Sequence, residues 1–177
     1  MVRNRLSKGY VQIYTGDGKG KTTAALGLAL RAAGHGMHTY IGQFMKGHPY
    51  GELEALVDHP CITIEQYGDV HFIRREEMTF EHAARARHGL ERAREAMYSD
   101  RYDLVVLDEI NVAIWFGLVS VEDVLALLDD RPLSVEVILT GRGAPQQLID
   151  RADLMTEMRE VKHYYAQGVP AREGIEQ

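Results

Sequence analysis

The sequence has one cysteine, Cys61, among 177 residues. A single cysteine excludes an internal disulfide and leaves no cysteine cluster for zinc, which favours a reducing compartment. Long apolar runs are also missing: no stretch approaches the ~18 residues that a membrane-spanning helix needs, and no apolar segment follows the basic N-terminal residues as it would in a secretory signal. We therefore expect a cytoplasmic protein that does not associate with a membrane.

Basic residues are in the minority, because 20 Lys and Arg stand against 26 Asp and Glu, a formal net charge of −6 at pH 7. Domains that bind the phosphate backbone of nucleic acids usually carry a basic excess, so we expect no nucleic-acid partner. No proline- or serine-rich linker divides the chain, and 45% hydrophobic residues suffice for one buried core. The sequence predicts a flexible tail over residues 1–8, which have no apolar periodicity, and a single nucleotide-binding domain over residues 9–177.

The most specific motif is a glycine-rich stretch between an alternating run at residues 10–14 and an Ala/Leu-rich segment at residues 24–33. This order is typical of a strand, a phosphate-binding loop and a helix, in which glycine N–H groups converge on phosphate oxygens, a lysine adds charge and the next hydroxyl can hold Mg²⁺. The candidate nucleotide-binding residues here are Gly16, Asp17, Gly18, Lys19, Gly20, Lys21, Thr22 and Thr23. In the common pattern G-x-x-x-x-G-K-[ST] the first glycine would fall at Thr15, whereas here it comes one residue later.

A second motif ends in two adjacent carboxylates. Four apolar residues at 104–107, typical of a parallel strand buried on both faces, precede Asp108 and Glu109. Mg²⁺ prefers oxygen ligands and normally keeps several waters, so one carboxylate, the Thr22 hydroxyl and phosphate oxygens would satisfy it. Because neighbouring side chains on a strand point to opposite faces, Asp108 and Glu109 are predicted to have different roles.

The remaining sequence alternates in the same way. We expect strands at residues 10–14, 37–44, 62–67, 102–109, 135–140 and 154–161, helices at 22–33, 52–59, 79–97, 120–130 and 145–152, and a polar tail at 162–177. This alternation predicts an α/β fold, a three-layer P-loop or RecA-like sandwich with a mostly parallel sheet of about six strands. Ligands of such sheets bind beyond the C-terminal strand ends, which adds Lys46 and Arg142 to the nucleotide-binding candidates.

The motifs together resemble one known family. The segments at residues 15–25, 43–47, 106–110, 140–143 and 161–163 are similar to those of the P-loop ATP:corrinoid adenosyltransferases of cobalamin biosynthesis, over a match from about residue 9 to the C-terminus. The loop of that family begins Thr-Gly-Asn/Asp-Gly-Lys-Gly-Lys-Thr-Thr, so the late first glycine, Gly16, fits it. The resemblance implies transfer of the 5′-deoxyadenosyl group of ATP to the Co(I) of a reduced corrinoid, either cobalamin or a precursor, with release of tripolyphosphate. It also implies a homodimer, ATP bound in reversed direction, and a flavodoxin-like or other reductase protein as partner.

The resemblance assigns roles by position. Lys21, Thr22 and Glu109 would form the catalytic set. Thr22 and Glu109 would bind Mg²⁺ directly, and Asp108 would either contact the Mg²⁺ ligands without touching the ion or support the loop. Some members place a Phe and a Trp after a glycine where this chain reads Gly-Asp-Val-His-Phe at residues 68–72, and those aromatics help to displace the lower axial ligand of the corrinoid. The corrinoid-facing candidates here are Gly68, His71 and Phe72. Trp115 and Phe116 are alternative aromatics, although a core position is the favoured interpretation for both.

Two other classes of function use the same loop. A P-loop ATPase or kinase would employ Glu109 as a base and would produce ADP. An ATP-gated binding module of RecA-like type would use the nucleotide to order loops for a partner. The products of ATP separate the two enzymatic hypotheses: tripolyphosphate indicates adenosyl transfer and ADP indicates phosphoryl transfer.

Overall fold

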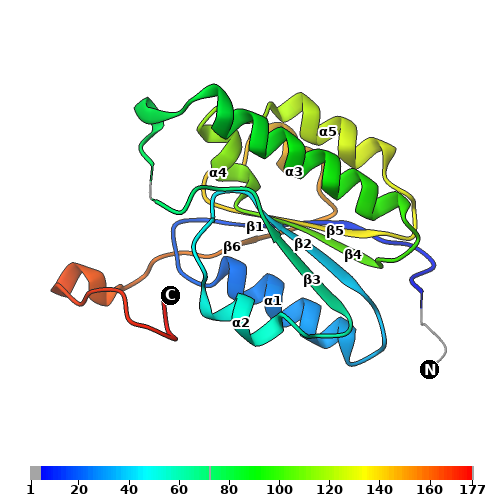
Figure 1. Cartoon of the computed structure of the whole chain (residues 1–177), viewed down its shortest axis with the longest axis horizontal. Helices are drawn as coiled ribbons and strands as arrows, with labels where there is room; N and C mark the ends of the chain where they lie inside the picture. The colour runs from blue at the N-terminus through cyan, green and yellow to red at the C-terminus, as the bar shows by residue number, and fades with distance from the viewer. Residues whose placement is uncertain (1–4, 72, 177) are drawn as a thin grey trace.

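The computed structural model describes residues 5–71 and 73–176. Six strands form one parallel sheet in the order β3-β2-β4-β5-β1-β6 (Figure 1). The strands are β1 (Val11–Thr15), β2 (Thr39–Gln43), β3 (Ile62–Gln66), β4 (Leu104–Asp108), β5 (Glu136–Thr140) and β6 (Leu154–Glu157). The predicted α/β fold with about six strands is confirmed. The first four residues of the predicted tail, and Phe72, lie outside the described residues.

Helices cover both faces of the sheet. One face carries α1 (Lys21–Ala33) and α2 (Gly51–Leu56), and the other carries α3 (Phe80–Tyr98), α4 (Ile110–Trp115), α5 (Val121–Asp130) and α6 (Gln146–Arg151) (Figure 1). Two short 3₁₀ helices, η1 (Arg75–Glu77) and η2 (Tyr164–Gln167), lie in the loops. None of the described helices has both the length and the apolar character that crossing a bilayer requires.

Side-chain alternation along the strands explains the three layers. In β4, Val105 and Leu107 pack into the core beneath α3 to α6, whereas Leu104 and Val106 pack against α1 and α2. Successive residues of a strand point to opposite faces, so a continuous apolar run fills both cores. The face of α1 toward the sheet consists of alanines at i, i+4 and i+7 (Ala25, Ala29 and Ala32). Small side chains at this spacing let the helix lie close beneath the strands.

A local sequence signal predicted the start of α5 correctly. Ser120 caps α5, because its hydroxyl accepts the Asp123 N–H at 3.0 Å while the Asp123 carboxylate accepts the Ser120 N–H at 3.3 Å. Two predictions were wrong. The strand expected to include Glu109 ends at Asp108, and a helix, α4, follows where none was expected. The last strand ends at Glu157 rather than at residue 161, and the supposed polar tail contains η2.

Candidate functional site

The glycine-rich loop is shaped by a neighbouring segment of chain as well as by its own sequence. Gly16 has φ 95°, and a Cβ there would lie 2.4 Å from the Met158 carbonyl oxygen. A Cβ on Gly18 would lie 2.7 Å from the same oxygen, to which the Gly18 N–H donates a hydrogen bond of 2.7 Å. The residues that follow β6 therefore press directly on the loop. Only glycine at these two positions permits that approach.

Lys21 opens α1 and is folded back into the loop. Its side chain is buried, and its Nζ donates to the carbonyl oxygens of Gly16 at 2.7 Å and Gly18 at 2.8 Å. Burial lowers the pKa of Lys21, the positive charge of Arg142 lowers it further, and Glu109 and Asp17 oppose the shift. No side chain caps the N-terminus of α1, so the first backbone N–H groups of the helix can donate hydrogen bonds to a bound anion.

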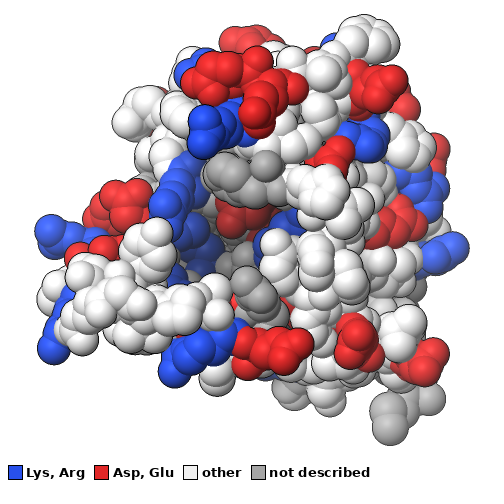
Figure 2. All heavy atoms as spheres, turned by 60° about the vertical axis from the view of Figure 1, so that its left-hand side comes forward, with Lys and Arg blue, Asp and Glu red and all other residues white. Residues whose placement is uncertain are grey.

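Around the loop is a cavity of about 850 Å³, which we call the cationic cavity. Its cations are Lys19, Lys21, Lys46 and Arg142, and Lys and Arg side chains gather around the hollow in this face of the molecule (Figure 2). The cavity is also lined by Asp17, Gly18, Gly20, Thr22, Thr23, Glu109, His163 and Gly174 to Glu176. Every nucleotide-binding candidate except Gly16 thus lies along one cavity.

Asp108 lies beneath this cavity and does not line it. The side chain is fully buried, and its Oδ1 accepts the hydroxyls of Thr22 at 2.9 Å and Thr140 at 2.7 Å. Its Oδ2 lies 3.0 Å from Lys46 Nζ and accepts Gln43 Nε2 at 3.3 Å. A buried carboxylate needs such partners to offset the loss of water. Asp108 therefore joins the first turn of α1 to the loop that follows β2.

Lys46 remains positively charged in this setting. Burial alone lowers its pKa, but the nearby Asp108 carboxylate, with Glu52 and Glu109, reverses the effect, and the pKa of Lys46 is raised. Its Nζ also lies 3.5 Å from Glu52 Oε1 and 5.3 Å from the centre of the Tyr50 ring. The lysine thus presents a fixed charge at the border of the cationic cavity.

Glu109 differs from Asp108 in backbone as well as in position. Its φ of 61° places it in the left-handed region, and its N–H donates to Thr140 Oγ1 at 2.9 Å. Burial, reinforced by the Asp108 charge, raises the pKa of Glu109. The two carboxylates therefore lie in different places, and the cause is the turn at the end of β4 rather than the strand alternation that was expected.

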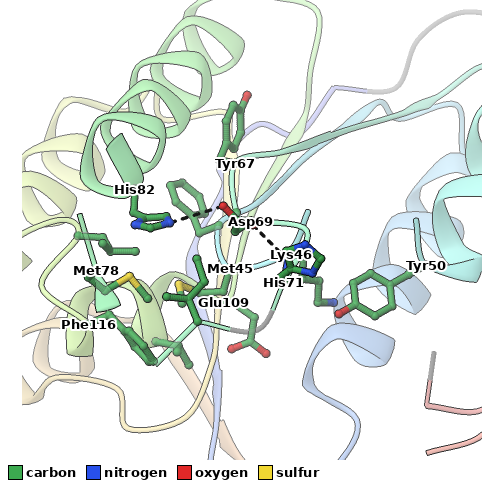
Figure 3. Close-up of a pocket in the computed structure, with 15 residues that line it drawn as sticks. Met45, Lys46, Tyr50, Tyr67, Asp69, His71, Met78, His82, Glu109 and Phe116 are labelled. Atoms are coloured by element: carbon green, nitrogen blue, oxygen red, sulfur yellow. Dashed lines mark hydrogen bonds and ion pairs between the residues drawn. The ribbon is translucent and has the colours of Figure 1, made fainter. Parts of the chain in front are cut away.

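Next to the cationic cavity is a second cavity of about 260 Å³, the apolar cavity (Figure 3). Its walls are mostly hydrophobic and aromatic: Phe44, Met45, Tyr67, Ile73, Met78, Val112, Phe116 and Leu118. Lys46, Tyr50, Glu109 and Val112 line both cavities. These four residues form the boundary at which a ligand in one cavity would meet a ligand in the other.

Two of the three corrinoid-facing candidates line the apolar cavity. Gly68 lines the apolar cavity where two loops cross, and a Cβ on it would lie 2.3 Å from the Lys46 backbone nitrogen. His71 also lines the cavity, and its backbone N–H donates to Asp69 Oδ1 at 3.1 Å. Asp69 further contacts Arg85 at 2.7 Å and His82 at 3.5 Å, the latter drawn in Figure 3. Phe72 falls outside the described residues.

Sequence patterns alone missed part of the site. Phe44 and Tyr67 each follow a strand end, a position that could have marked them as candidates, but both fall within segments that were expected to be strands. The favoured core interpretation fails for Trp115, which is 57% exposed with the Arg75 guanidinium 5.0 Å from its ring centre. Phe116 packs against the core and also lines the apolar cavity.

A glycine-rich loop between β1 and α1, a lysine and a hydroxyl at the start of that helix, and a buried aspartate at the end of β4 define a P-loop-type α/β protein. Within this class the chain belongs to the ATP:corrinoid adenosyltransferase family, because the family described as ATP:corrinoid adenosyltransferase BtuR/CobO/CobP matches residues 7–177. The resemblance predicted from the motifs is confirmed, and with it membership in a family of transferases.

Individual relatives agree. The corrinoid adenosyltransferase of Sinorhizobium sp is 37% identical over 179 residues, which cover 96% of this chain and 80% of the relative. That of Escherichia coli (strain K12) is 36% identical over 171 residues, covering 96% and 86%. Corrinoid adenosyltransferase CobA of Salmonella typhimurium is 37% identical over 178 residues, with the same coverage of 96% and 86%.

Proposed function

We propose that this protein transfers the 5′-deoxyadenosyl group of ATP to the Co(I) of a corrinoid and releases tripolyphosphate. The main support is the contact between the cationic and apolar cavities along Lys46, Tyr50, Glu109 and Val112. A triphosphate in the first cavity and a corrin ring against the second would bring C5′ and cobalt together at this boundary. Fixing both reactants in this way can supply much of the rate acceleration.

In this proposal the cations of the loop hold the triphosphate. Lys21 already donates to two carbonyl oxygens, and those hydrogen bonds would be exchanged for bonds to phosphate oxygens. Lys19 and Arg142 line the same cavity, and backbone N–H groups at residues 16–23 would complete the grip. As the C5′–O bond breaks, its electron pair stays on the tripolyphosphate. Preorganised cations stabilise that developing charge.

The residues also fit Mg²⁺. The carboxylate of Glu109 makes no hydrogen bond or ion pair with another described side chain, and burial raises its pKa, a cost that a bound cation would offset. Glu109 and the Thr22 hydroxyl would hold the ion together with phosphate oxygens and water. When bound, it would neutralise part of the phosphate charge. Asp108 would orient Thr22 and Lys46, since both of its oxygens are already engaged.

The corrinoid supplies the nucleophile, so the protein needs no general base. Cobalt forms the new bond to C5′ with its own electron pair, and no proton moves. The hydrophobic and aromatic walls of the apolar cavity would exclude water from the strongly reducing Co(I) centre. Gly68 and His71 would then lie beside the corrinoid.

We further propose, from the resemblance, that the enzyme acts as a cytoplasmic homodimer and receives electrons from a flavodoxin-like or other reductase protein. The single cysteine supports the reducing compartment. Light scattering coupled to size exclusion tests the dimer, and a stable monomer at micromolar concentration would contradict it.

The direct test of function is anaerobic incubation of the protein with Co(I) cobalamin, ATP and Mg²⁺. We expect the Co(I) absorbance to decay in step with the appearance of tripolyphosphate. Persistent Co(I) absorbance with accumulation of ADP would instead indicate a P-loop ATPase or kinase. Unchanged ATP together with tight nucleotide binding would indicate a binding module.

A further inference from the structure

The last described residues fold back onto the phosphate-binding loop. Lys19 Nζ donates to the Ile175 carbonyl oxygen at 2.7 Å and to Glu176 Oε1 at 2.9 Å. Gly174, Ile175 and Glu176 line the cationic cavity beside the loop. A lysine expected to bind phosphate is therefore paired with a carboxylate from the other end of the chain.

Glu176 is held in place by more than Lys19. Its carboxylate accepts from Arg172 Nη2 at 3.1 Å and from the Tyr164 hydroxyl, and its side chain is only 15% exposed. The Arg172 guanidinium, with Tyr164 and Lys19, holds the pKa of Glu176 well below its usual range. The group is a charged acceptor at neutral pH, and Arg172 and Tyr164 keep it beside the loop whether or not Lys19 is bound to it.

We propose that Glu176 competes with phosphate for Lys19: its carboxylate binds the lysine when no nucleotide is bound, yields it to the triphosphate of ATP and recaptures it as tripolyphosphate leaves. A triphosphate carries more negative charge than one carboxylate, so ATP can displace Glu176. Lys19 is 42% exposed, and an ion pair with a solvent-exposed partner contributes little stability, which makes the exchange reversible.

The identity of the product rests on the proposed function, and its chemistry explains why a competitor is useful. Tripolyphosphate keeps every phosphate group of ATP, so each contact to the triphosphate of the substrate also retains the product. Release then limits turnover unless a group on the protein replaces some of those contacts. Glu176 is tethered beside Lys19 and acts at a high effective concentration.

The test is calorimetric titration of inorganic tripolyphosphate into the full chain, with Mg²⁺ and constant ionic strength. Glu176→Gln keeps the side-chain size but removes the charge, and we expect tripolyphosphate to bind about two- to fivefold more tightly, as the strength of a partly exposed ion pair suggests. Glu173→Gln is the matched control, because Glu173 is an exposed acid of the same segment without an ion pair to another described residue. Its affinity should equal that of the unmodified protein.

A double-mutant cycle identifies Lys19 as the link. In a Lys19→Gln background, Glu176→Gln should no longer change the affinity. Unchanged or weaker binding by Glu176→Gln, or an effect that persists without Lys19, would overturn the proposal. If Glu176→Gln does not fold, Glu176→Asp, which shortens the carboxylate arm, should tighten binding in the same direction, and unchanged affinity there would equally overturn it. The titration contains no corrinoid, so it stands even if adenosyl transfer is not observed.

Discussion

Lys21 lines the cationic cavity and Asp108 lies beneath it, and both are buried with polar partners from the protein. Burying a charge is unfavourable unless it is paired and hydrogen-bonded. Lys21 donates hydrogen bonds to carbonyl oxygens of the loop, and Asp108 accepts hydrogen bonds from two hydroxyls and pairs with Lys46. A bound phosphate would replace carbonyl oxygens with a charged acceptor, so Lys21 gains more from the ligand than an exposed lysine would.

For this reason Lys21→Ala should lower kcat/KM for ATP by at least about 100-fold, the usual effect of removing one preorganised donor from a developing anion. The decay of Co(I) absorbance at varied ATP concentration measures it. Lys8→Ala removes an exposed lysine stacked on Tyr10, far from the loop, and serves as the control. Equal values of kcat/KM for the two variants would contradict the assignment of Lys21 to the phosphate site.

Single residues also mark the limit of prediction from sequence. The loop motif was recognisable because its glycines, lysine and threonines are adjacent in the chain. The reason for the late first glycine was not, since Gly16 and Gly18 lie against the backbone of Met158, about 140 residues away in sequence. Long-range backbone contacts leave no periodic signal in either segment.

At the level of elements, the apolar cavity depends on how α3 lies against β3 and the residue that follows it. Arg92 of α3 donates to both carboxylate oxygens of Glu65, at 3.2 Å and 3.0 Å. The same carboxylate accepts from Tyr40 at 2.9 Å and from Tyr67. The Tyr67 hydroxyl is thereby fixed on the side away from the cavity, while its ring forms part of the wall (Figure 3).

Glu65→Gln tests this anchor. Arg92, Tyr67 and Tyr40 lower the pKa of Glu65 from 4.5 to about 2. The pKa is depressed in the folded state, so its stabilising contribution is present above pH 4.5 and is lost as the pH falls toward 2. At pH 7 we expect a loss of about 1–2 kcal/mol after allowing for solvent screening, measured by urea denaturation. The difference between the two proteins should shrink as the pH falls from 4.5 to 2, and a constant difference would contradict the assignment.

Gly89→Ala should disturb the cavity from the helix side. A Cβ on Gly89 would lie 2.7 Å from Tyr67 Cδ2 and 3.0 Å from Phe44 Cε1, and both rings line the apolar cavity. Overpacking typically costs about 1–3 kcal/mol, more than the gain of up to about 1 kcal/mol from replacing a helical glycine. We expect lower stability and a raised KM for the corrinoid, with KM for ATP unchanged.

Gly27→Ala in α1 is the control for that substitution. Gly27 is also inside a helix, but its Cβ would meet nothing within 4 Å. It should stabilise the protein by about 0.5–1 kcal/mol and leave both KM values unchanged. A matching rise in corrinoid KM for Gly27→Ala would show that the effect at Gly89 is not specific to the cavity.

Short elements were the hardest to predict. The apolar spacing of α3 and the cap of α5 were readable because periodicity and local hydrogen bonds are properties of adjacent residues. The six-residue α4 begins after a left-handed Glu109, which carries none of the usual start signals. The segment after β6 was predicted to be a polar tail, because its contact with Lys19, over 150 residues away in the sequence, leaves no local signal.

Across the whole molecule, the residues proposed to bind substrate gather at one edge of the sheet. The loops after β1, β2, β4 and β5 all contribute to the cationic cavity, as expected for parallel strands that share one direction. The chain after β6 returns to the same edge and closes it beside the loop. The opposite edge carries the turns at residues 34–38, 99–103 and 131–135, which contribute nothing to either cavity among the described residues.

Hydrogen exchange should distinguish the two edges of the sheet. With Mg²⁺ and ATP at about 100 times Kd, ligand binding adds about 2.7 kcal/mol to any opening that must release the nucleotide, so exchange there should slow by about 100-fold. We expect this slowing at residues 16–23, 45–51, 141–143 and 158–163, because these segments enclose the cationic cavity or press on its loop. The turns at residues 34–38, 99–103 and 131–135 should exchange as before, and they serve as internal controls. Equal slowing at both edges would indicate global stabilisation without a localised site. Slowing confined to residues 16–23 would show that the segment after β6 takes no part in nucleotide binding.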